Sequence, residues 1–382
     1  MTGGICIAHG GDISEPSGGT NRIIAFANAL DEAGFDVLLV VPTPRGDLPD
    51  SLKDDIPIHT VPIKARTIKD QMIRALLVSS KAKRLAEENN MILQIEHSSL
   101  AGVATLIGCS KYVLDMHDPV SLSPLYTQKP FSKIIKKFIY LIEKIAVKQS
   151  LKIIVVSNPM KKYIIENWNI PEEKIVIIPN GYFEEKIKKF NFNKNNEEID
   201  GLVSFLGTLH PKLDIDKIIY LAKSLKNVKI YVIGDGPARL ELERKIIKNN
   251  LKNIIITGRL PDEKAFNILS KSQVVIYPLK KSTYTLALVS VKIFDYAALG
   301  KAMVLDDVSE SEIWKKFKEK KAAMFSDPSN PNEFVECVRN LLEDERLRRK
   351  IGANAKMLVK EFSWENISKK LVKLYKEEIV WK

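Results

Sequence analysis

Apolar residues recur along this chain in two ways, as short continuous runs and as longer stretches spaced three or four residues apart. Continuous runs predict buried strands, and spaced stretches predict amphipathic helices. In the first half the two alternate, which predicts a parallel sheet with helices on both faces. The predicted strands lie at residues 4–10, 35–43, 55–62, 91–97, 111–118, 152–157 and 174–181, and the main helices between them at 20–33, 68–89, 98–108 and 159–168.

The alternation stops after Gly181 and then begins again. Residues 184–200 are polar and weakly periodic, which predicts an interdomain linker. A second set of strands and helices follows, and residues 364–376 form a last amphipathic stretch. We therefore predict an α/β protein of two doubly wound, Rossmann-like domains facing a cleft, with ligands beyond the carboxyl ends of the strands. The domains are residues 1–183 and 201–360, and residues 361–382 are a final helical segment.

The segment from Val274 to Leu305 reads as strand, loop, helix and strand. Ser290 is a suitable N-cap for the helix, and Gly300 stands where a helix commonly ends. The amino end of a helix favours an anion, and Asp295, one turn further in, can bind sugar hydroxyls. A ligand with both groups is a nucleotide-sugar.

Glycines mark several other predicted strand ends in the second half. Gly207 and Gly234 close two apolar runs, and Gly258 closes a third with Arg259 beside it. Glycine permits a tight turn and a close approach of backbone to a ligand, and arginine can reach a phosphate or a base. The alternatives are an ordinary turn and a solvated arginine, because the third glycine of a dinucleotide fingerprint is absent after Gly236.

The first half offers a second group of candidates at its strand ends. Gly18 and Gly19 precede a helix, where backbone N–H groups can receive a phosphate. His117 follows a strand and is flanked by Asp115 and Asp118, so it can act as a base or bind a sugar hydroxyl. A purely structural histidine is the alternative. Three further residues are expected on the same rim, namely His9, Glu96 and His97.

Charge adds a possible partner. The formal net charge is +12, and Lys129–Lys152 carries seven lysines and one acid, Glu143. Its apolar residues recur at helical spacing between the lysines, which suits a helix lying on an anionic membrane surface. A helix that turns its apolar side to the core is equally compatible with the pattern. Aromatic residues do not interleave with the basic ones, so we expect no nucleic-acid partner.

Several classes are excluded or disfavoured. No apolar run reaches the length of a membrane span, and the first residues do not resemble a signal peptide. The three cysteines are far apart, which favours a reducing, cytoplasmic compartment. The sequence contains no clustered metal ligands, nucleophile elbow or Walker loop, so we expect no metal and no cofactor.

Taken in order, these motifs resemble those of the group-1 (family 4) glycosyltransferases, which have the GT-B fold and retain the configuration of the sugar. The likeness runs nearly end to end. It rests on the Gly18-Gly19 loop, the His117 strand end, VVSNPMKKYI, IPNG at 178–181, FLGTL at 205–209, VIGDGP at 232–237, ITG at 256–258 and FDYAALGKAMV.

The resemblance implies a nucleotide-diphosphate sugar as donor, held mostly by the second domain, and a glycan or lipid-linked acceptor on the first. It also implies that the last helix returns to the first domain and that no metal is needed. Asp295 then binds the ribose, Ser290 and Val291 meet the diphosphate, Gly258 and Arg259 border the base, and His117 lies near the reacting sugar. Gly207, Thr208, Lys212, Gly234 and Lys292 complete the expected donor side.

Three positions depart from the family pattern. The first glutamate of the usual pair falls on Ala287, the usual arginine on Thr208, and the usual lysine on Leu213. Lys292–Tyr296 resembles the branch of the family that also lacks the first glutamate. Arginine and lysine normally neutralise the leaving diphosphate. An active transferase remains the expectation, with a weakly active or inactive binding subunit and a nucleotide-sugar epimerase as alternatives.

Overall fold

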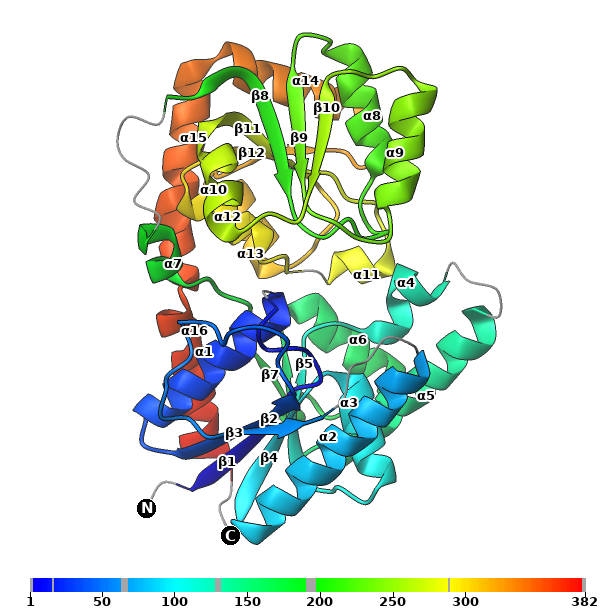
Figure 1. The fold of residues 1–382 in the computed structure, drawn as a ribbon, viewed down its shortest axis with the longest axis vertical. Helices are drawn as coiled ribbons and strands as arrows, with labels where there is room; N and C mark the ends of the chain where they lie inside the picture. Colours follow the sequence, from blue (N-terminus) through cyan, green and yellow to red (C-terminus); the bar gives the residue numbers. More distant parts are fainter. Residues whose placement is uncertain are drawn as a thin grey trace. The chain divides into compact units, whose positions relative to one another are not determined.

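A computed structural model describes residues 3–15, 17–62, 68–127, 132–189, 197–287 and 289–379. The chain divides into two compact units. The first comprises residues 1–181 together with 364–382, and the second comprises residues 182–363. Each unit is an α/β structure around one parallel sheet, shown in Figure 1. The expected fold class of two doubly wound units is therefore confirmed.

The sheet of the first unit has the strand order β3-β2-β1-β4-β5-β6-β7, and the pairings within it are parallel. Its strands are apolar runs whose side chains are mostly buried, as expected for a sheet covered on both faces. The strands are β1 Gly4–Ala8, β2 Asp36–Pro42, β3 Ile58–Val61, β4 Met91–Glu96, β5 Tyr112–Met116, β6 Lys152–Val155 and β7 Ile175–Ile177.

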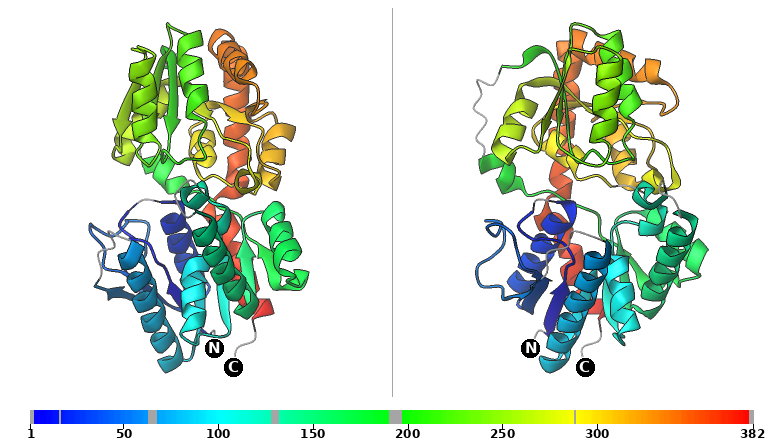
Figure 2. Two further views of the ribbon diagram at one scale, coloured as in Figure 1. Left: turned by 90° about the vertical axis from the view of Figure 1, so that its right-hand side faces the viewer. Right: turned by 45° about the vertical axis from the view of Figure 1, so that its right-hand side comes forward.

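Helices cover both faces of this first sheet. Helix α3 packs between α2 and α5 on one face, and α1 packs with α16 (Figure 1 and Figure 2). The helices are α1 Gly18–Glu32, α2 Ile68–Glu88, α3 Ser98–Leu106, α4 Pro124–Thr127, α5 Ser132–Gln149, α6 Asn158–Trp168 and α16 Trp364–Lys373, with short turns η1 Val120–Leu122, η2 Glu172–Lys174 and η4 Leu374–Glu378.

The sheet of the second unit repeats this arrangement with the order β10-β9-β8-β11-β12-β13, again in parallel. In both sheets the order reverses beside the first strand of the unit, which makes a topological switch point. The strands are β8 Ile199–Leu206, β9 Lys229–Ile233, β10 Ile254–Gly258, β11 Ser272–Tyr277, β12 Ala302–Asp306 and β13 Met324–Ser326.

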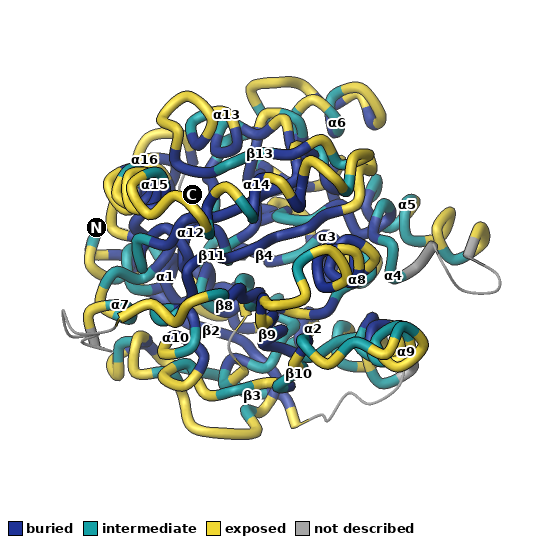
Figure 3. Tube along the Cα trace, turned by 90° about the horizontal axis from the view of Figure 1, so that it is seen from above, coloured by how far each residue is buried: buried dark blue, intermediate teal, exposed yellow. Residues whose placement is uncertain are grey.

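The helices of the second unit cover its sheet in the same way. They are α7 Glu184–Lys189, α8 Ile215–Ser224, α9 Arg239–Lys248, α10 Asp262–Lys271, α11 Thr283–Leu286, α12 Lys292–Ala298, α13 Glu312–Glu319, α14 Pro331–Glu343 and α15 Glu345–Leu358, followed by the turn η3 Val359–Phe362. Figure 3 shows β11 as buried and the outer turns of α9 and α15 as exposed.

The last helix, α16, belongs to the first unit. Trp364 packs edge-on against Phe26 of α1 with ring centroids 5.9 Å apart. One turn beyond α16, the hydroxyl of Tyr375 donates to Gln94 Oε1 of β4 at 2.7 Å, and both residues are fully buried. Residues distant in sequence therefore complete the core of the first unit.

Two local expectations were wrong. Part of the 184–200 linker is structured, because α7 occupies Glu184–Lys189 and β8 begins at Ile199; residues 190–196 lie outside the described residues. Ser290 does not cap α12, which begins after Val291 without a side-chain cap. Gly300 does end that helix as expected, with a left-handed φ of 67°.

Candidate functional site

In the first unit, a buried cluster of histidines and one carboxylate lies at the carboxyl ends of β1, β4 and β5. The switch point of the sheet falls between β1 and β4, where ligands of such folds bind. His9 follows β1, and its Nδ1 contacts a carboxylate oxygen of Glu96, the last residue of β4. The other oxygen, Glu96 Oε1, lies 3.8 Å from His117 Nε2. One buried carboxylate thus faces two imidazoles.

Gly19 allows this carboxylate to approach the first turn of α1. A Cβ atom on Gly19 would lie 2.6 Å from Glu96 Oε1 and 3.8 Å from His117 Cε1. Ser17 caps the helix, because its hydroxyl accepts from the N–H of Thr20 at 3.0 Å. A carboxylate at the amino end of a helix is favourable. The predicted phosphate contact at Gly18 and Gly19 stays a prediction, and Glu96 already places negative charge beside that turn.

Burial makes this cluster electrostatically unusual. Burial, together with the nearby His117 and His97, lowers the pKa of His9 to about 3. Burial and His117 likewise lower the pKa of His97 to about 4. Within the described residues, His9 Nε2 and His117 Nδ1 are buried without a hydrogen-bond partner. The cluster therefore presents two imidazole nitrogens, on His9 and His117, that an incoming hydroxyl could satisfy.

The backbone at His97 is strained. Its φ of 77° is in the left-handed region, which a residue with a side chain seldom adopts. The strain places the His97 ring edge-on to the His117 ring, with centroids 5.5 Å apart. His97 Nδ1 also lies 2.9 Å from Ser99 Oγ. Strain of this kind concentrates at functional sites, and here it brings the three predicted acceptor-side residues next to His117.

The role expected for Asp115 was wrong. Asp115 was considered as a carboxylate neighbour of His117, but it pairs with Arg22 of α1 through Nε at 2.8 Å and Nη2 at 2.9 Å. Arg22 also donates to the carbonyl oxygens of Ile178 and Pro179. Both charged side chains are fully buried. This buried pair holds β5, α1 and the loop after β7 together beneath the histidine cluster.

In the second unit the strand ends are built from backbone instead. The N–H of Gly207 donates to the carbonyl of Ile233 at 2.9 Å, and that of Gly234 donates to Gly258 at 2.9 Å. A Cβ on Gly234 would lie 1.9 Å from the carbonyl oxygen of Gly207. The ends of β8, β9 and β10 can approach this closely only because these positions are glycine. Three predicted donor-side residues thus meet at one edge of the sheet.

Helix α12 lies beside these glycines. A Cβ on Gly207 would lie 3.5 Å from Lys292 Cγ, and Lys292 Nζ lies 3.4 Å from Asp295 Oδ2. The buried hydroxyl of Tyr296 accepts from the N–H of Leu206 at 2.8 Å, which fixes the helix on β8. The Ser290 hydroxyl donates to Tyr277 Oη at 2.9 Å. It therefore does not cap α12, whose N-cap residue is Val291. Gly207, Lys292 and Asp295 therefore form one group.

The remaining donor-side positions lie in the loops around this group. Thr208 and Arg259 are exposed. Lys212 Nζ lies 5.8 Å from the centre of the Tyr284 ring. Leu213 is buried and bridges to Leu279, and Ala287 is buried after α11. Lys292 lies against Gly207, the residue before the position of the missing arginine, whereas Lys212 lies over an aromatic ring.

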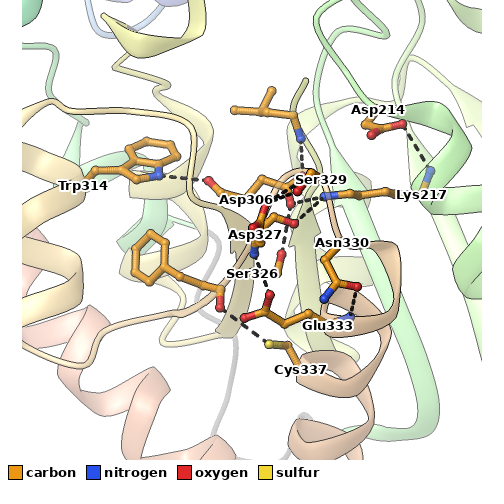
Figure 4. A network of polar contacts seen from close by, with 12 residues as sticks. Asp214, Lys217, Asp306, Trp314, Ser326, Asp327, Ser329, Asn330, Glu333 and Cys337 are labelled. Atoms are coloured by element: carbon orange, nitrogen blue, oxygen red, sulfur yellow. Dashed lines mark hydrogen bonds and ion pairs between the residues drawn. The ribbon is translucent and has the colours of Figure 1, made fainter. Parts of the chain in front are cut away.

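A second buried ion pair supports the loop after β11. Lys217 of α8 contacts Asp306 at the end of β12, and Asp306 Oδ2 accepts from the N–H of Leu279 at 2.8 Å (Figure 4). Ser326 Oγ donates to Asp306 Oδ1 at 3.0 Å. Burial raises the pKa of Asp306, and the Lys217 ammonium opposes that shift. Like Arg22 and Asp115, this pair stabilises strand ends.

Sequence reasoning did not find the two buried pairs. A charged residue inside an apolar strand is a usable signal, and Asp115 lies within the apolar run YVLDM. Such a residue needs a buried partner, since an unpaired charge there is very costly. The partner Arg22 is 93 residues away, so its identity needed the structure.

Metal binding finds no support in the part of the chain that the structure describes. No group of three or more histidine, cysteine, aspartate or glutamate side chains there is arranged to hold a metal ion. That transfer proceeds without a metal stays a prediction.

Comparison with known families matches most of the chain. The family model described as Glycosyltransferase Family 4 matches residues 16–185. The model described as Glycosyl transferases group 1 matches residues 198–344. The first model covers the sheet of the first unit except β1, and so includes Glu96, His97 and His117 but not His9. The second model covers the sheet of the second unit, including Gly207, Gly234 and Gly258.

Individual relatives agree with these models. A protein of Methanocaldococcus jannaschii described as an uncharacterized glycosyltransferase is 26% identical over 234 residues, which are 61% of this chain and 62% of that relative. The chain thus matches about three fifths of the length of that curated relative.

Solved structures show the same fold. Sucrose-phosphate synthase of Thermosynechococcus elongatus has a TM-score of 0.78 at 15% identity, covering 99% of both chains. The HepE protein of Anabaena, solved with UDP-glucose, has a TM-score of 0.73 at 16% identity, covering 97% of this chain and 99% of that one. At such identities the likeness concerns the fold alone.

Proposed function

We propose, since the chain belongs to the group-1 (family 4) glycosyltransferases and has their GT-B fold, that it moves a sugar from a nucleotide-diphosphate sugar to a glycan or lipid-linked acceptor. The reaction retains the anomeric configuration and needs no metal. The bond from the sugar C1 to the diphosphate oxygen breaks, and its electron pair leaves with the nucleoside diphosphate. The acceptor hydroxyl forms the new bond on the same face and gives its proton to the leaving phosphate.

The meeting of Gly207, Gly234 and Gly258 beside α12 carries the donor half of this proposal. Close backbone approach leaves room for a diphosphate, which the backbone N–H groups of Ser290 and Val291 would meet, and Asp295 supplies a carboxylate for ribose hydroxyls. A UDP-sugar is supported as donor by the HepE protein, which was solved with UDP-glucose.

Lys292 is our candidate for the charge that the missing arginine and lysine would supply. Its side chain lies against Gly207, next to Thr208, and is 37% exposed. A cation at that place stabilises negative charge that develops on the leaving diphosphate. Lys212 is the weaker candidate because its ammonium lies over the Tyr284 ring.

His117 and Glu96 carry the sugar-side half. The free Nδ1 of His117 can bind a hydroxyl of the reacting sugar, while Glu96 orients the ring from its other nitrogen. His9 and His97 border the same place and are proposed to meet the acceptor.

The first test is a thermal-shift screen with UDP-, GDP-, dTDP- and ADP-sugars, because a ligand that binds only the folded state raises the melting temperature. We expect one nucleotide to stand out. No shift with any of them would contradict the donor assignment. The stabilising donor is then incubated with glycan and lipid-linked acceptors, and products are followed by mass spectrometry.

A binding subunit with little or no transferase activity is the second candidate. It is favoured by Ala287, Thr208 and Leu213, which replace three charged residues of the family pattern. Donor binding without transfer or hydrolysis would support it. A product formed from donor alone, with an inverted sugar centre, would instead identify an epimerase.

The proposed location is cytoplasmic, with attachment to the inner face of a membrane. Among the described residues, no helix has the length and apolar character needed to cross a bilayer. Attachment through Lys129–Lys152 therefore has to be argued from the surface of the first unit.

A further inference from the structure

Large apolar side chains are exposed on one side of the first unit. Helix α5 exposes Ile134, Phe138 and Leu141, at 69%, 56% and 47% of their surface. Helix α2 exposes a second set, which comprises Met72, Ile73, Leu76 and Leu77. Scattered apolar residues are normal on protein surfaces, but two such groups on neighbouring elements point to a partner.

The exposed apolar residues of α5, Ile134, Phe138 and Leu141, form a stripe that shows which side of the helix faces solvent. Residues 134, 138 and 141 share one face at spacings of four and three, and that face points to solvent. The opposite side of α5 packs on α3, where a Cβ on Gly102 would lie 2.9 Å from the carbonyl oxygen of Ile142. Ile134, Phe138 and Leu141 are therefore not covered by the core, whereas Ile142, another apolar residue of Lys129–Lys152, packs against α3.

The charge around the stripe is positive. Lys133, Lys136, Lys137 and Lys148 are exposed on α5, and no carboxylate of the described residues forms an ion pair with them. The one acid of the helix, Glu143, is buried and accepts from Ser98 Oγ at 2.8 Å and from the N–H of Val120 at 2.8 Å. Glu143 thus stabilises the interior and does not offset the lysines at the surface.

The two apolar groups lie toward one edge of the sheet. Helix α3 packs between α2 and α5, so both belong to the same covered face (Figure 1 and Figure 2). A helix that follows a parallel strand begins at the carboxyl edge of the sheet. Met72–Leu77 fall in the first half of α2, and Ile134–Leu141 fall within the first ten of the eighteen residues of α5. The exposed apolar groups therefore lie toward the edge that carries His9, Glu96 and His117.

We propose that this face, formed by Met72–Leu77 of α2 and Ile134–Leu141 of α5, docks on the surface of an anionic lipid bilayer. Apolar side chains enter the interface between headgroups and acyl chains, and the lysines meet the lipid phosphates. Lysine is depleted in protein–protein interfaces, so lysines beside exposed isoleucine and phenylalanine fit lipid better than a protein partner. Docking stands on its own geometry, whereas its use, to bring a lipid-linked acceptor to the histidine cluster, rests on the proposed function.

Flotation with vesicles tests the docking. The full chain is mixed with vesicles of phosphatidylcholine alone or of phosphatidylcholine with phosphatidylglycerol, at low and at high salt. We expect retention on the anionic vesicles at low salt and weaker retention at high salt, since salt screens the lysines. Failure of the wild-type chain to float with anionic vesicles at low salt would overturn the proposal.

Two matched triple variants locate the surface. Ile134→Ser, Phe138→Ser and Leu141→Ser remove the α5 stripe and are expected to weaken vesicle binding by about tenfold or more. Leu240→Ser, Ile247→Ser and Met357→Ser change equally exposed apolar residues on α9 and α15 of the second unit, and should leave binding unchanged. Equal loss in both variants would contradict the assignment to α5.

Two further readouts separate the other outcomes. The thermal shift with the donor nucleotide should persist in the α5 variant, so a failure of docking and a failure of the proposed function give different results. Sedimentation measures self-association. A wild-type dimer that the α5 variant loses, together with no vesicle binding, would assign the face to a second copy of the chain and overturn the membrane proposal.

Discussion

The two units each have a candidate site at their strand ends, but one site is built from side chains and the other from backbone. In the first unit, buried side chains form the site, and Glu96 contacts His9 and lies beside His117. In the second unit, backbone forms it, with Gly207, Gly234 and Gly258 in mutual contact. Both sites occupy the carboxyl edge of a sheet with the same strand order.

This difference between a backbone site and a side-chain site fits the ligands that we propose for them, a diphosphate in the second unit and an acceptor hydroxyl in the first. A diphosphate has many acceptor oxygens and is well bound by N–H groups, which glycine exposes. An acceptor hydroxyl needs a few directed nitrogen and oxygen partners, which side chains supply. The same fold therefore carries a backbone site in one unit and a side-chain site in the other. Three substitutions and a change of pH should affect the two sites differently.

The largest effect is expected from the buried pair beneath the side-chain site. Arg22→Met leaves Asp115 buried without its partner and should lower the free energy of unfolding by about 3–5 kcal/mol. Urea unfolding measures it. Arg349→Met, which breaks an exposed pair with Glu345, is the control and should change nothing measurable. Equal stability of the two variants would refute a supporting role for Arg22.

Gly234→Ala tests the backbone site. The new Cβ would meet the Gly207 carbonyl at 1.9 Å, in a residue whose φ is 142°. We expect a loss of about 2–3 kcal/mol in stability and no thermal shift with donor. Gly46→Ala, whose Cβ would lie 3.7 Å from Ser14 Oγ, should behave as wild type. A Gly234→Ala chain that binds donor normally would contradict the close-approach model.

Asp295→Ala probes the one carboxylate of the backbone site. Loss of a charged hydrogen bond to ribose should weaken donor binding by about 1.5–3 kcal/mol, or about ten- to hundredfold in Kd. Calorimetric titration with the donor identified by screening provides the value. Asp307→Ala removes an exposed carboxylate of the same unit that pairs with Lys318 and is the matched control. Unchanged affinity in Asp295→Ala would remove the ribose assignment.

Acid should also distinguish the two units. Burial lowers the pKa values of His9 and His97 to about 3 and about 4, below the value of about 6.5 in an unfolded chain. The unfolded state then binds protons that the folded state excludes, so stability falls as the pH falls from about 6 to about 4. Each of the two histidines contributes a slope of up to about 1.4 kcal/mol per pH unit in this range.

Urea unfolding at several pH values, followed by hydrogen exchange in each unit, measures that slope. The first unit should weaken first, because the second contains a single histidine, His210. His97→Gln should flatten the slope, and His59→Gln should not. Equal acid sensitivity in the two units would contradict the contrast between them.

Much of the fold could be predicted from the sequence, because strands that are buried on both faces have continuous apolar runs. The strand-end glycines were also predicted, and the closest contact is at Gly234, where a Cβ would lie 1.9 Å from the carbonyl oxygen of Gly207. Pairing was not predicted. Asp115 was expected beside His117, but Asp115 pairs with Arg22, which is far away in sequence. The carboxylate that lies beside His117 is that of Glu96.

Short-range signals also failed where tertiary contacts dominate. Ser290 has the chemistry of a helix cap, yet its hydroxyl bonds to Tyr277 of the adjacent strand. The lysine-rich helix left two orientations open, because both give the same spacing of apolar residues. The structure combines the two, because Ile142 packs against Gly102 of α3 while Ile134, Phe138 and Leu141 are exposed.

The return of α16 to the first unit has a consequence for synthesis. Trp364 and Tyr375 complete the core around Phe26 and Gln94, yet they leave the ribosome after the whole of residues 182–363. Chains emerge from their amino end, and domains generally fold as units. The second unit can therefore be finished while the first still lacks part of its core, so the order of completion reverses the order of translation.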